Sequence, residues 1–455
     1  MKRVVLAARI AARYLLRRSG GNRRRTLSAV AGIALSMVPL ILVMEMADGM
    51  IRGITARYIE TGTYHLQAYP GAEIELEGLR QAAKELLAVP GITSVSPEHR
   101  GVGLLSAAGG KSGVQVRSVP PDLPERDRGF GGYLSVEAGS FDIAEPSSIV
   151  LGRYLAEELD VSPGEEVRLL TVRSLEGRSF LPRVSRFTVT GVVSTGYQEL
   201  DRLWAFVNLE RGLRVLPPEN SDTYLGLKME HPYALQQNLF GSPLPSLQEY
   251  RTESAAGDTL RGVTDTLGQD WQVYSWYNLE RSRYVSFRTS RNLLLFIMML
   301  IVIVASVNVS STLVMLVVEK EQEIAFLRTL GAHPMLIQQI FLTAGGIIGV
   351  AGVSLGTLLG VTVAVNVNEL LRGLEQLVNM VAGLARSFTA PAGGAGAERI
   401  LLFSQEYYLE RVPISLDPLE LATLAALAMA LSVIAAVVPA RRSVKVYPLE
   451  LLRRH

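Results

Sequence analysis

The side chains that could support chemistry are few and widely separated. Cysteine is absent, so the chain has neither a thiol nucleophile nor a disulfide. Its histidines lack the short spacings typical of metal ligands; they are His65, His99, His231, His333 and His455. No set of residues forms a recognisable nucleophile, base and oxyanion arrangement. We therefore expect no enzymatic, metal or cofactor site in this chain.

A Gly-Gly-Lys-Ser turn at 109–112 resembles the end of a phosphate-binding loop. That motif requires a glycine where Leu105 stands. Strand-like segments at 101–107 and 114–119 flank the turn, so we expect a β-hairpin there.

Two carboxylates, Glu45 and Asp48, lie three residues apart near the end of the first apolar run. They share one face of the expected helix. Acidic residues at such a depth either mark the membrane interface or line a substrate path between helices. In the second reading, Met44, Val307 and Asn308 complete a candidate lipoprotein cavity.

The elements that position these residues are mainly membrane spans. The chain is 48% hydrophobic and 19% charged, which is too apolar for an ordinary soluble protein. Its net charge of +2 gives no reason to expect a nucleic-acid partner. Four apolar runs reach the roughly 20 residues that a bilayer requires, at 27–47, 293–318, 335–365 and 418–440.

Residues 48–276 have a globular composition, so we expect an α+β membrane protein with a large mixed α/β domain between the first and second spans. Within it we expect helices at 79–89 and 149–159 and strands at 92–96, 101–107, 114–119, 166–172, 187–193 and 271–274. The remaining segments are an amphipathic N-terminal helix (1–26), a stalk helix (277–292), a charged connection (319–334), a loop (366–417) and a tail (441–455).

Arginine and lysine cluster in the N-terminal segment and in the tail. The positive-inside rule therefore predicts that both ends of the chain are cytoplasmic. In the third span, glycines recur at 345 and 349 and then at 352, 356 and 360. Such a ridge is typical of close helix packing.

Residues 173–186 exceed the length of a tight hairpin and join two expected strands. Their centre holds Phe180, Leu181 and Pro182 between Arg178 and Arg183. An exposed apolar tip with basic neighbours favours contact with a partner protein. The alternative is an ordinary excursion of a β-domain.

Between the second and third spans, Ile324, Leu327 and Leu330 recur at helical spacing. Gly331 and Pro334 supply the expected helix-ending chemistry. On periodicity alone, this short amphipathic helix is either a turn at the membrane surface or a docking element.

The run SSTLVMLVVEKEQEIAFLRTLGA at 310–332 resembles the corresponding junction of the MacB/FtsX-like ABC permease superfamily. The resemblance implies the MacB-like, type VII permease fold and a short helix that docks into a separate ATPase subunit. The contact residues that it implies are Glu323, Ile324, Ala325, Leu327 and Arg328.

Three further stretches resemble lipoprotein-releasing permeases of the LolC/LolE type: RFTVTGVV with TGYQELD from 186, YYL with VPI from 407, and PARRS with PLELL from 439. The resemblance implies a bacterial inner-membrane complex that extracts lipoproteins from the outer leaflet. The partners it implies are LolD-like ATPase subunits that bind ATP and Mg, a second permease subunit, membrane lipids and a LolA-like periplasmic carrier. Residues 173–186 then occupy the position of a carrier hook.

Other readings stay open at this point. A MacB-like pump would drive periplasmic partners, an FtsX-like module would regulate a cell-wall hydrolase, and a structural anchor would do neither. The sequence also leaves open a LolC-like, LolE-like or combined role, and a homodimer or heterodimer.

Overall fold

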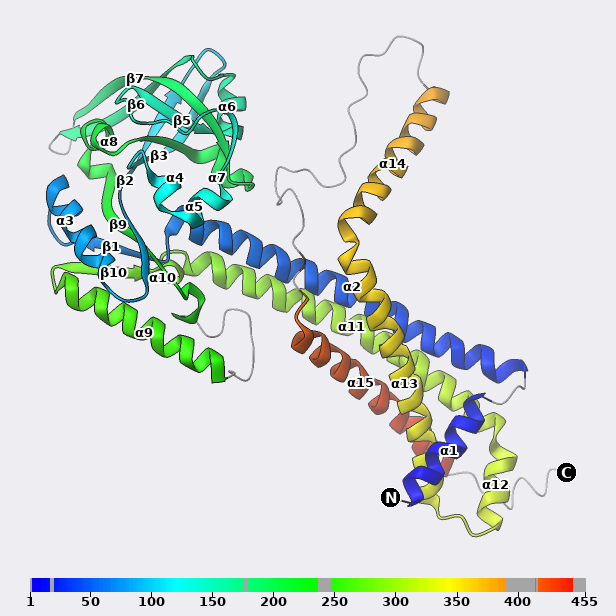
Figure 1. Cartoon of the computed structure of the whole chain (residues 1–455). Coiled ribbons are helices and arrows are strands. Elements are labelled where there is room, and N and C mark those ends of the chain that lie inside the picture. The colour runs from blue at the N-terminus through cyan, green and yellow to red at the C-terminus, as the bar shows by residue number, and fades with distance from the viewer. Residues whose placement is uncertain are drawn as a thin grey trace. The chain divides into compact units, whose positions relative to one another are not determined.

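The computed structural model describes residues 2–16, 20–175, 179–235, 247–389, 414 and 416–444. The chain divides into two compact units (Figure 1). The helical unit comprises residues 1–49, 289–402 and 412–455, and the α/β unit comprises residues 50–288 and 403–411.

Long apolar helices dominate the helical unit. Its elements, two of which continue into the α/β unit, are α1 (Lys2–Leu16), α2 (Gly20–Arg57), α11 (Arg281–Glu319), α12 (Glu321–Thr329), α13 (Pro334–Val365), α14 (Val367–Thr389) and α15 (Pro418–Val444). Within the described ranges, α2, α11, α13 and α15 are long and apolar enough to cross a membrane. The expected four-span architecture is confirmed.

The glycines of α13 bring two neighbouring helices into close contact. A Cβ at Gly349 would lie 2.8 Å from the Cβ of Ser432 on α15. A Cβ at Gly356 would lie 2.6 Å from the Cβ of Met37 on α2. The glycine ridge of α13 therefore packs against two helices. Its first part faces α15, and its later part faces α2.

The predicted stalk helix runs directly into the second span within one helix, α11, which no glycine or proline interrupts over residues 281–319. One expected boundary in this unit differs from the structure. The predicted loop after the third span begins with a helix, α14. The apolar residues of α14 recur at helical spacing. The sequence was interpreted as a loop because of the Gly-rich tract at 391–396, which lies outside the described residues.

The α/β unit is built on one mixed sheet. Its strands are β1 (Leu66–Pro70), β2 (Ile92–Ser106), β3 (Lys111–Val119), β4 (Ser135–Gly139), β5 (Ser148–Gly152), β6 (Glu166–Leu175), β7 (Ser179–Ser194), β8 (Trp204–Asn208), β9 (Ser221–Met229) and β10 (Trp271–Ser275). They run in the order β10-β1-β9-β2-β3-β8-β5-β7-β4. Because β6 pairs with both β2 and β7, strands β2, β3, β8, β5, β7 and β6 form a closed ring.

Short helices connect and cover these strands. They are η1 (Tyr58–Thr63), α3 (Leu76–Leu87), α4 (Leu123–Arg126), α5 (Arg128–Tyr133), α6 (Arg153–Leu159), α7 (Gln198–Leu203), α8 (Leu209–Val215), η2 (Pro218–Asn220), η3 (Pro232–Leu235), α9 (Leu247–Leu267) and α10 (Trp276–Leu279). An apolar core fills the ring of strands, with Val116, Leu151 and Phe187 among its buried members.

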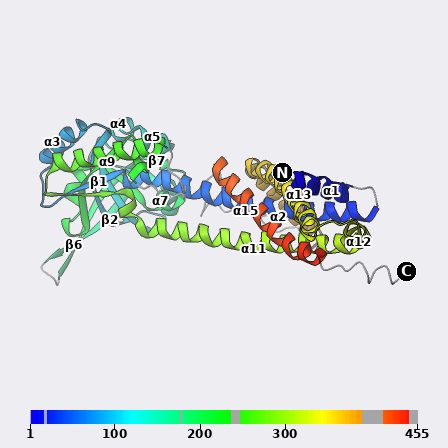
Figure 2. The same cartoon turned by 90° about the horizontal axis from the view of Figure 1, so that it is seen from below.

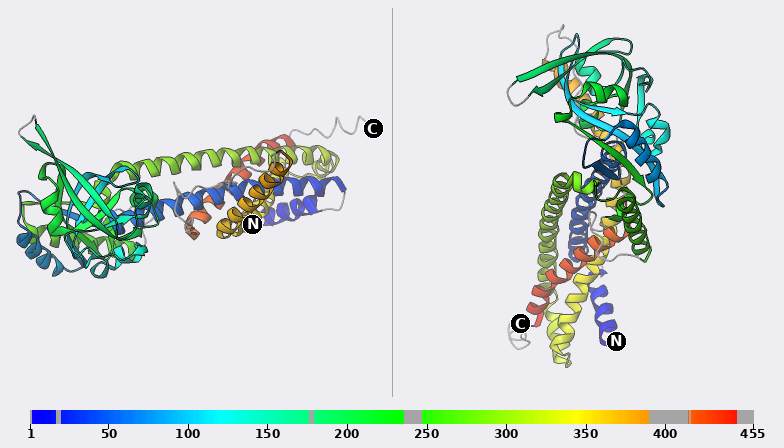
Figure 3. Two further views of the ribbon diagram at one scale, coloured as in Figure 1. Left: turned by 90° about the horizontal axis from the view of Figure 1, so that it is seen from above. Right: turned by 90° about the vertical axis from the view of Figure 1, so that its left-hand side faces the viewer.

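The β10-β1-β9-β2 end of the sheet has one apolar face and one polar face. On β9, Leu225 and Leu227 belong to the core that includes residues of α3 and α9, two helices seen beside this end in Figure 3. Side chains alternate along a strand, so Tyr224 and Lys228 lie on the opposite face. That face receives the end of α2.

Two segments that we predicted as a helix and as a loop contain strands in the structure. Residues 149–159 are not one helix, since β5 occupies 148–152 and α6 follows it; the β-branched Ile149 and Val150 fit a buried strand. Residues 173–186 are not a long loop, because β6 and β7 pair out to Leu175 and Ser179. Figure 2 shows these two strands reaching away from the rest of the α/β unit. The turn at 109–112 is a β-hairpin turn, as expected.

Candidate functional site

The helix α12 connects the second and third spans and presents a small apolar surface. Phe326 is 65% exposed and Leu330 is 70% exposed. At its start, the Lys320 ammonium donates to Glu323 Oε1 at 2.6 Å and lies over the ring of Tyr14 in α1. These contacts fix the angle at which α12 leaves α11.

The five residues predicted to contact an ATPase do not share one exposed face. Ile324 and Ala325 are buried, so neither offers free surface to a partner in this structure. Glu323, Leu327 and Arg328 are half-buried. Spacing predicts that a helix is amphipathic, but the packing of α12 on its own chain decides which apolar residues stay free.

The predicted lipoprotein cavity is also not formed as expected. Met44, Glu45 and Asp48 are each at most 3% exposed within the helical unit. Asp48 binds the guanidinium of Arg291 on α11, which also binds Glu420 on α15. These residues join three helices instead of lining an open path.

The two remaining cavity residues lie elsewhere. Val307 is 61% exposed on α11, and Asn308 beside it is exposed. They belong to an apolar face of α11 that also includes Phe296, Leu300 and Val304, each at least 46% exposed. The structure therefore does not bring the five predicted residues together.

The predicted hook residues lie on the β6–β7 hairpin. Leu181 is 53% exposed and Val184 is 59% exposed. Arg183 donates to the carbonyl of Arg214 at 2.6 Å and anchors β7 to α8. Pro182 pairs in register with Val172. Arg178 lies outside the described residues, and the Phe180 side chain is not described.

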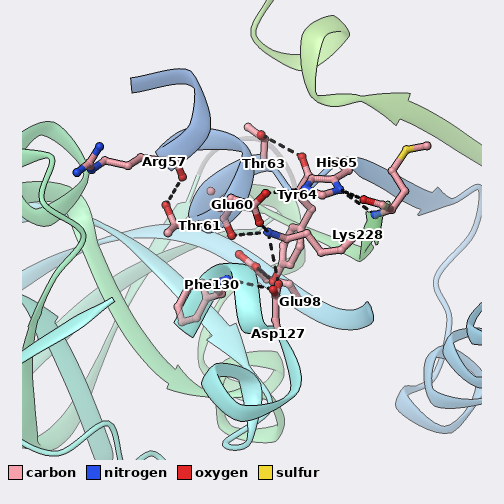
Figure 4. Close-up of polar contacts among 12 residues, drawn as sticks. Arg57, Glu60, Thr61, Thr63, Tyr64, His65, Glu98, Asp127, Phe130 and Lys228 are labelled. Atoms are coloured by element: carbon pink, nitrogen blue, oxygen red, sulfur yellow. Dashed lines mark hydrogen bonds and ion pairs between the residues drawn. The ribbon is translucent and has the colours of Figure 1, made fainter. Parts of the chain in front are cut away.

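A site that the sequence analysis missed lies where α2 ends in the α/β unit, and we call it the joint (Figure 4). The helix ends in a π-helical turn, η1, whose last carbonyls have no partner within the helix. Side chains of the sheet, buried except for the half-buried Arg100, donate to them: Lys228 to Glu60, Arg117 to Thr61, Arg100 to Gly62 and Gln67 to Thr63. Three of the four donors are cations, which suit the negative end of a helix dipole.

Carboxylates balance the buried cations of the joint. Glu98 accepts from Arg117 at 2.7 and 2.8 Å and from Arg100 at 2.9 Å. Burial disfavours a charged Glu98, but the two guanidinium groups outweigh burial and lower its pKa to about 2. The ammonium of Lys228 lies between Glu60 and Asp127, 3.6 Å from the latter. Breaking such a pair would leave an uncompensated buried charge.

His65 completes the joint and stays neutral. The backbone N–H of Met229 donates to its Nδ1 at 2.8 Å, so Nε2 carries the proton and donates to Glu60 Oε1 at 3.0 Å. Burial lowers the pKa of His65, against the opposing effect of Glu60. The available signal was a cation that follows alternating apolar residues in each of two strands, Arg117 in β3 and Lys228 in β9. Their burial, however, depends on pairing between distant segments.

The first helical turns after β10 reinforce this region. Trp276 and Tyr284 are buried against Ile59 of η1, with ring centroids of the aromatic pair 4.9 Å apart. Arg283 donates to Glu199 at 3.1 Å and lies over the ring of Tyr58. The end of α2 and the start of α11 are therefore held together within the α/β unit.

Comparison with known proteins covers almost the whole chain. Residues 26–232 match the MacB-like periplasmic core domain, and residues 295–448 match the FtsX-like permease C-terminal family. The lipoprotein-releasing system transmembrane protein LolC of Neisseria meningitidis serogroup B is 29% identical over 454 residues, covering 98% of this chain and 99% of the relative.

Two further relatives agree. LolC of Xylella fastidiosa (strain 9a5c) is 25% identical, with 98% of each chain covered. LolE of Haemophilus influenzae is 26% identical, with 93% of each chain covered.

Four spanning helices with a mixed α/β domain inserted between the first and second define a permease of the MacB-like fold. Within that class, the chain is similar along nearly its whole length to the permeases LolC and LolE.

Proposed function

We propose that this chain is the permease subunit of an ATP-driven complex that extracts lipoproteins from the outer leaflet of the bacterial inner membrane and passes them to a periplasmic carrier. The observation that carries the proposal is the match to LolC, which extends over 98% of the chain and includes both units. The match to LolE supports the same activity.

Extraction of a lipoprotein requires an energy source. Each buried methylene of an acyl chain contributes about 0.8 kcal/mol to membrane anchoring, so two or three chains do not leave the bilayer spontaneously. We assign ATP and Mg to LolD-like partner subunits and no cofactor to this chain. The permease then supplies an apolar surface for the acyl chains and a change of conformation, and it makes or breaks no covalent bond.

The orientation of the chain follows from its charges. Arginine-rich segments at the N-terminus and in the tail favour a cytoplasmic location for both ends. With four spans, α12 then also lies on the cytoplasmic side. Phe326 and Leu330 are its exposed apolar residues and make the proposed ATPase contact, flanked by Glu323, Leu327 and Arg328.

The exposed face of α11 provides a surface for acyl chains or for a second permease subunit. Phe296, Leu300, Val304 and Val307 follow one another at three- or four-residue spacing and are all exposed. Such a stripe faces lipid or another helix. We propose that the lipoprotein chains are held beside it, between two permease subunits.

The β6–β7 hairpin is the proposed carrier hook. Its exposed Leu181 and Val184 offer apolar surface. Strands β6 and β7 pair out to Leu175 and Ser179, so the hairpin is already ordered before a partner binds. This order lowers the conformational entropy that is lost on binding.

One reconstitution tests the function together with the hook. The complex is placed in proteoliposomes with an acylated lipoprotein, ATP and the carrier, and released lipoprotein is measured. Replacement of 173–181 by Asn-Gly retains the anchors at Thr171 and Arg183. We expect this variant to hydrolyse ATP and retain lipoprotein but not transfer it.

The matched control replaces only Glu176 and Gly177 by Asn-Gly and leaves Arg178 and Leu181 in place, so it should transfer normally. Transfer by the 173–181 variant at the unsubstituted rate would exclude the hook assignment. ATP hydrolysis without any lipoprotein release by the unsubstituted complex would favour a MacB-like pump instead.

A further inference from the structure

A groove in the α/β unit lies apart from the hairpin and the joint. It has a volume of about 740 Å³ and is lined by the end of β1, the loop at 71–75, the start of β9 and residues of α8 and η2. Grooves of about 300–1,000 Å³ are typical of ligand sites.

The groove exists because two strands diverge. The β1–β9 register ends at Ala68 and Leu225, whereas β1 continues beside β10 to Pro70. Residues 221–224 of β9 stay paired with β2 on their other side. On the groove side, the backbone of this segment lies beyond the β1–β9 pairing, which leaves a short strand edge open to pairing.

The groove is acidic. Glu73, Glu75 and Asp222 line it, and its lining contains no lysine or arginine. All three carboxylates are exposed, and none forms an ion pair within the described ranges. The lining also contains apolar residues, Ile74 and Leu216 among them.

A buried polar atom gives independent evidence for a ligand. His99 lines the groove and is 5% exposed. Its Nδ1 bonds the hydroxyl of Thr223 at 2.8 Å, while its Nε2 is buried without a hydrogen-bond partner among the described residues. An unsatisfied buried polar group is costly unless a bound molecule completes it.

We propose that this groove binds an extended peptide segment of a partner protein that carries basic side chains. Its cationic groups face Glu73, Glu75 and Asp222, and its backbone pairs with residues 221–224 of β9. His99 Nε2 bonds a polar atom of the segment, and apolar side chains rest on Ile74 and Leu216. Strand addition supplies main-chain bonds, and the charges and pockets supply specificity.

The test uses the full-length permease in its complex, in an uncharged detergent, with a fluorescein-labelled peptide of alternating lysine and valine as the probe. We expect saturable binding by anisotropy, and protection of residues 221–224 in hydrogen exchange. The triple variant Glu73→Gln, Glu75→Gln, Asp222→Asn should weaken binding by about tenfold or more. His99→Leu should also weaken binding without lowering the melting temperature of the α/β unit.

A matched control removes three exposed carboxylates elsewhere in the unit, through Glu125→Gln, Glu145→Gln and Asp265→Asn. This variant should bind like the unsubstituted chain. Equal binding by both triple variants, equal binding of a glutamate-for-lysine peptide, or no saturable binding would overturn the proposal. Binding without protection of 221–224 would overturn the strand pairing. These results do not depend on lipoprotein release, so they can fail while the proposed function stands.

Discussion

Phe326 is the side chain on which energy coupling should depend most directly. It is 65% exposed on α12, whereas its neighbour Ile324 is 1% exposed and packs in the permease core. Phe326→Asp would place a carboxylate in an apolar contact, which costs several kcal/mol unless the charge is paired. We expect this variant to fold and assemble at a normal level but to lose most lipoprotein-stimulated ATP hydrolysis.

Ile324→Asp is the contrasting variant, because it buries a charge inside the permease itself. It should reduce the yield of folded chain before any effect on coupling is seen. If Phe326→Asp instead leaves stimulated hydrolysis intact in an assembled complex, α12 does not dock through this face.

His99 should make the stability of the α/β unit depend on pH. Burial lowers its pKa to about 4 from an ordinary 6.5. As the pH falls between these two pKa values, the unfolded chain takes up a proton that the folded chain does not. The free energy of unfolding therefore decreases as the pH decreases, by roughly 3 kcal/mol in total. His99→Gln should therefore show a smaller drop in melting temperature between about pH 7.5 and pH 4.5.

Tryptophan fluorescence measures this effect in the intact chain, because Trp204, Trp271 and Trp276 all belong to the α/β unit. The exposed His231 provides the control. His231→Gln should leave the pH dependence unchanged. A His99→Gln variant with the full pH-dependent drop would show that another group is responsible.

At the scale of elements, α13 depends on glycine where it meets α2. Gly356 faces Met37 and the backbone of Ala34, whereas nothing lies within 4 Å of a Cβ built at Gly346 on the same helix. Gly356→Leu should force the helices apart and lower the monodisperse fraction after heating in detergent. Gly346→Leu should behave like the unsubstituted chain, and equal sensitivity of the two variants would contradict the packing described here.

Local sequence patterns correctly predicted the elements that one property of nearby residues determines. Apolar length located the spans, and a glycine ridge predicted close packing. The β6–β7 hairpin was misread as a loop because Pro182 and the surrounding charges resemble loop chemistry, although a two-stranded arm tolerates both. The β5–α6 boundary was missed because a short apolar run fits a strand or a helix equally well.

The candidate sites were predicted less well than the fold, for a physical reason. Exposure of Ile324 and Asp48 depends on helices that are distant in sequence, and the joint depends on pairing that brings Lys228 to Glu60. No local periodicity carries this information. We also expect the joint to hold η1 to the sheet when α2 moves, because side chains of the sheet donate to all four of the last carbonyls of η1.

At the scale of the whole molecule, the chain combines a spanning unit with a large α/β unit and has the features of a permease. A LolC protein matches 98% of the chain and a LolE protein 93% of it. In the proposed function, ATP hydrolysis by the complex responds to acylated proteins as its substrate.

The most direct test compares one lipoprotein with its non-acylated form. The complex of this permease with its ATPase is placed in lipid nanodiscs, and ATP hydrolysis is measured with each form. We predict that only the acylated protein stimulates hydrolysis, and that the stimulation disappears in the Phe326→Asp variant. Equal rates with the two forms would contradict the account.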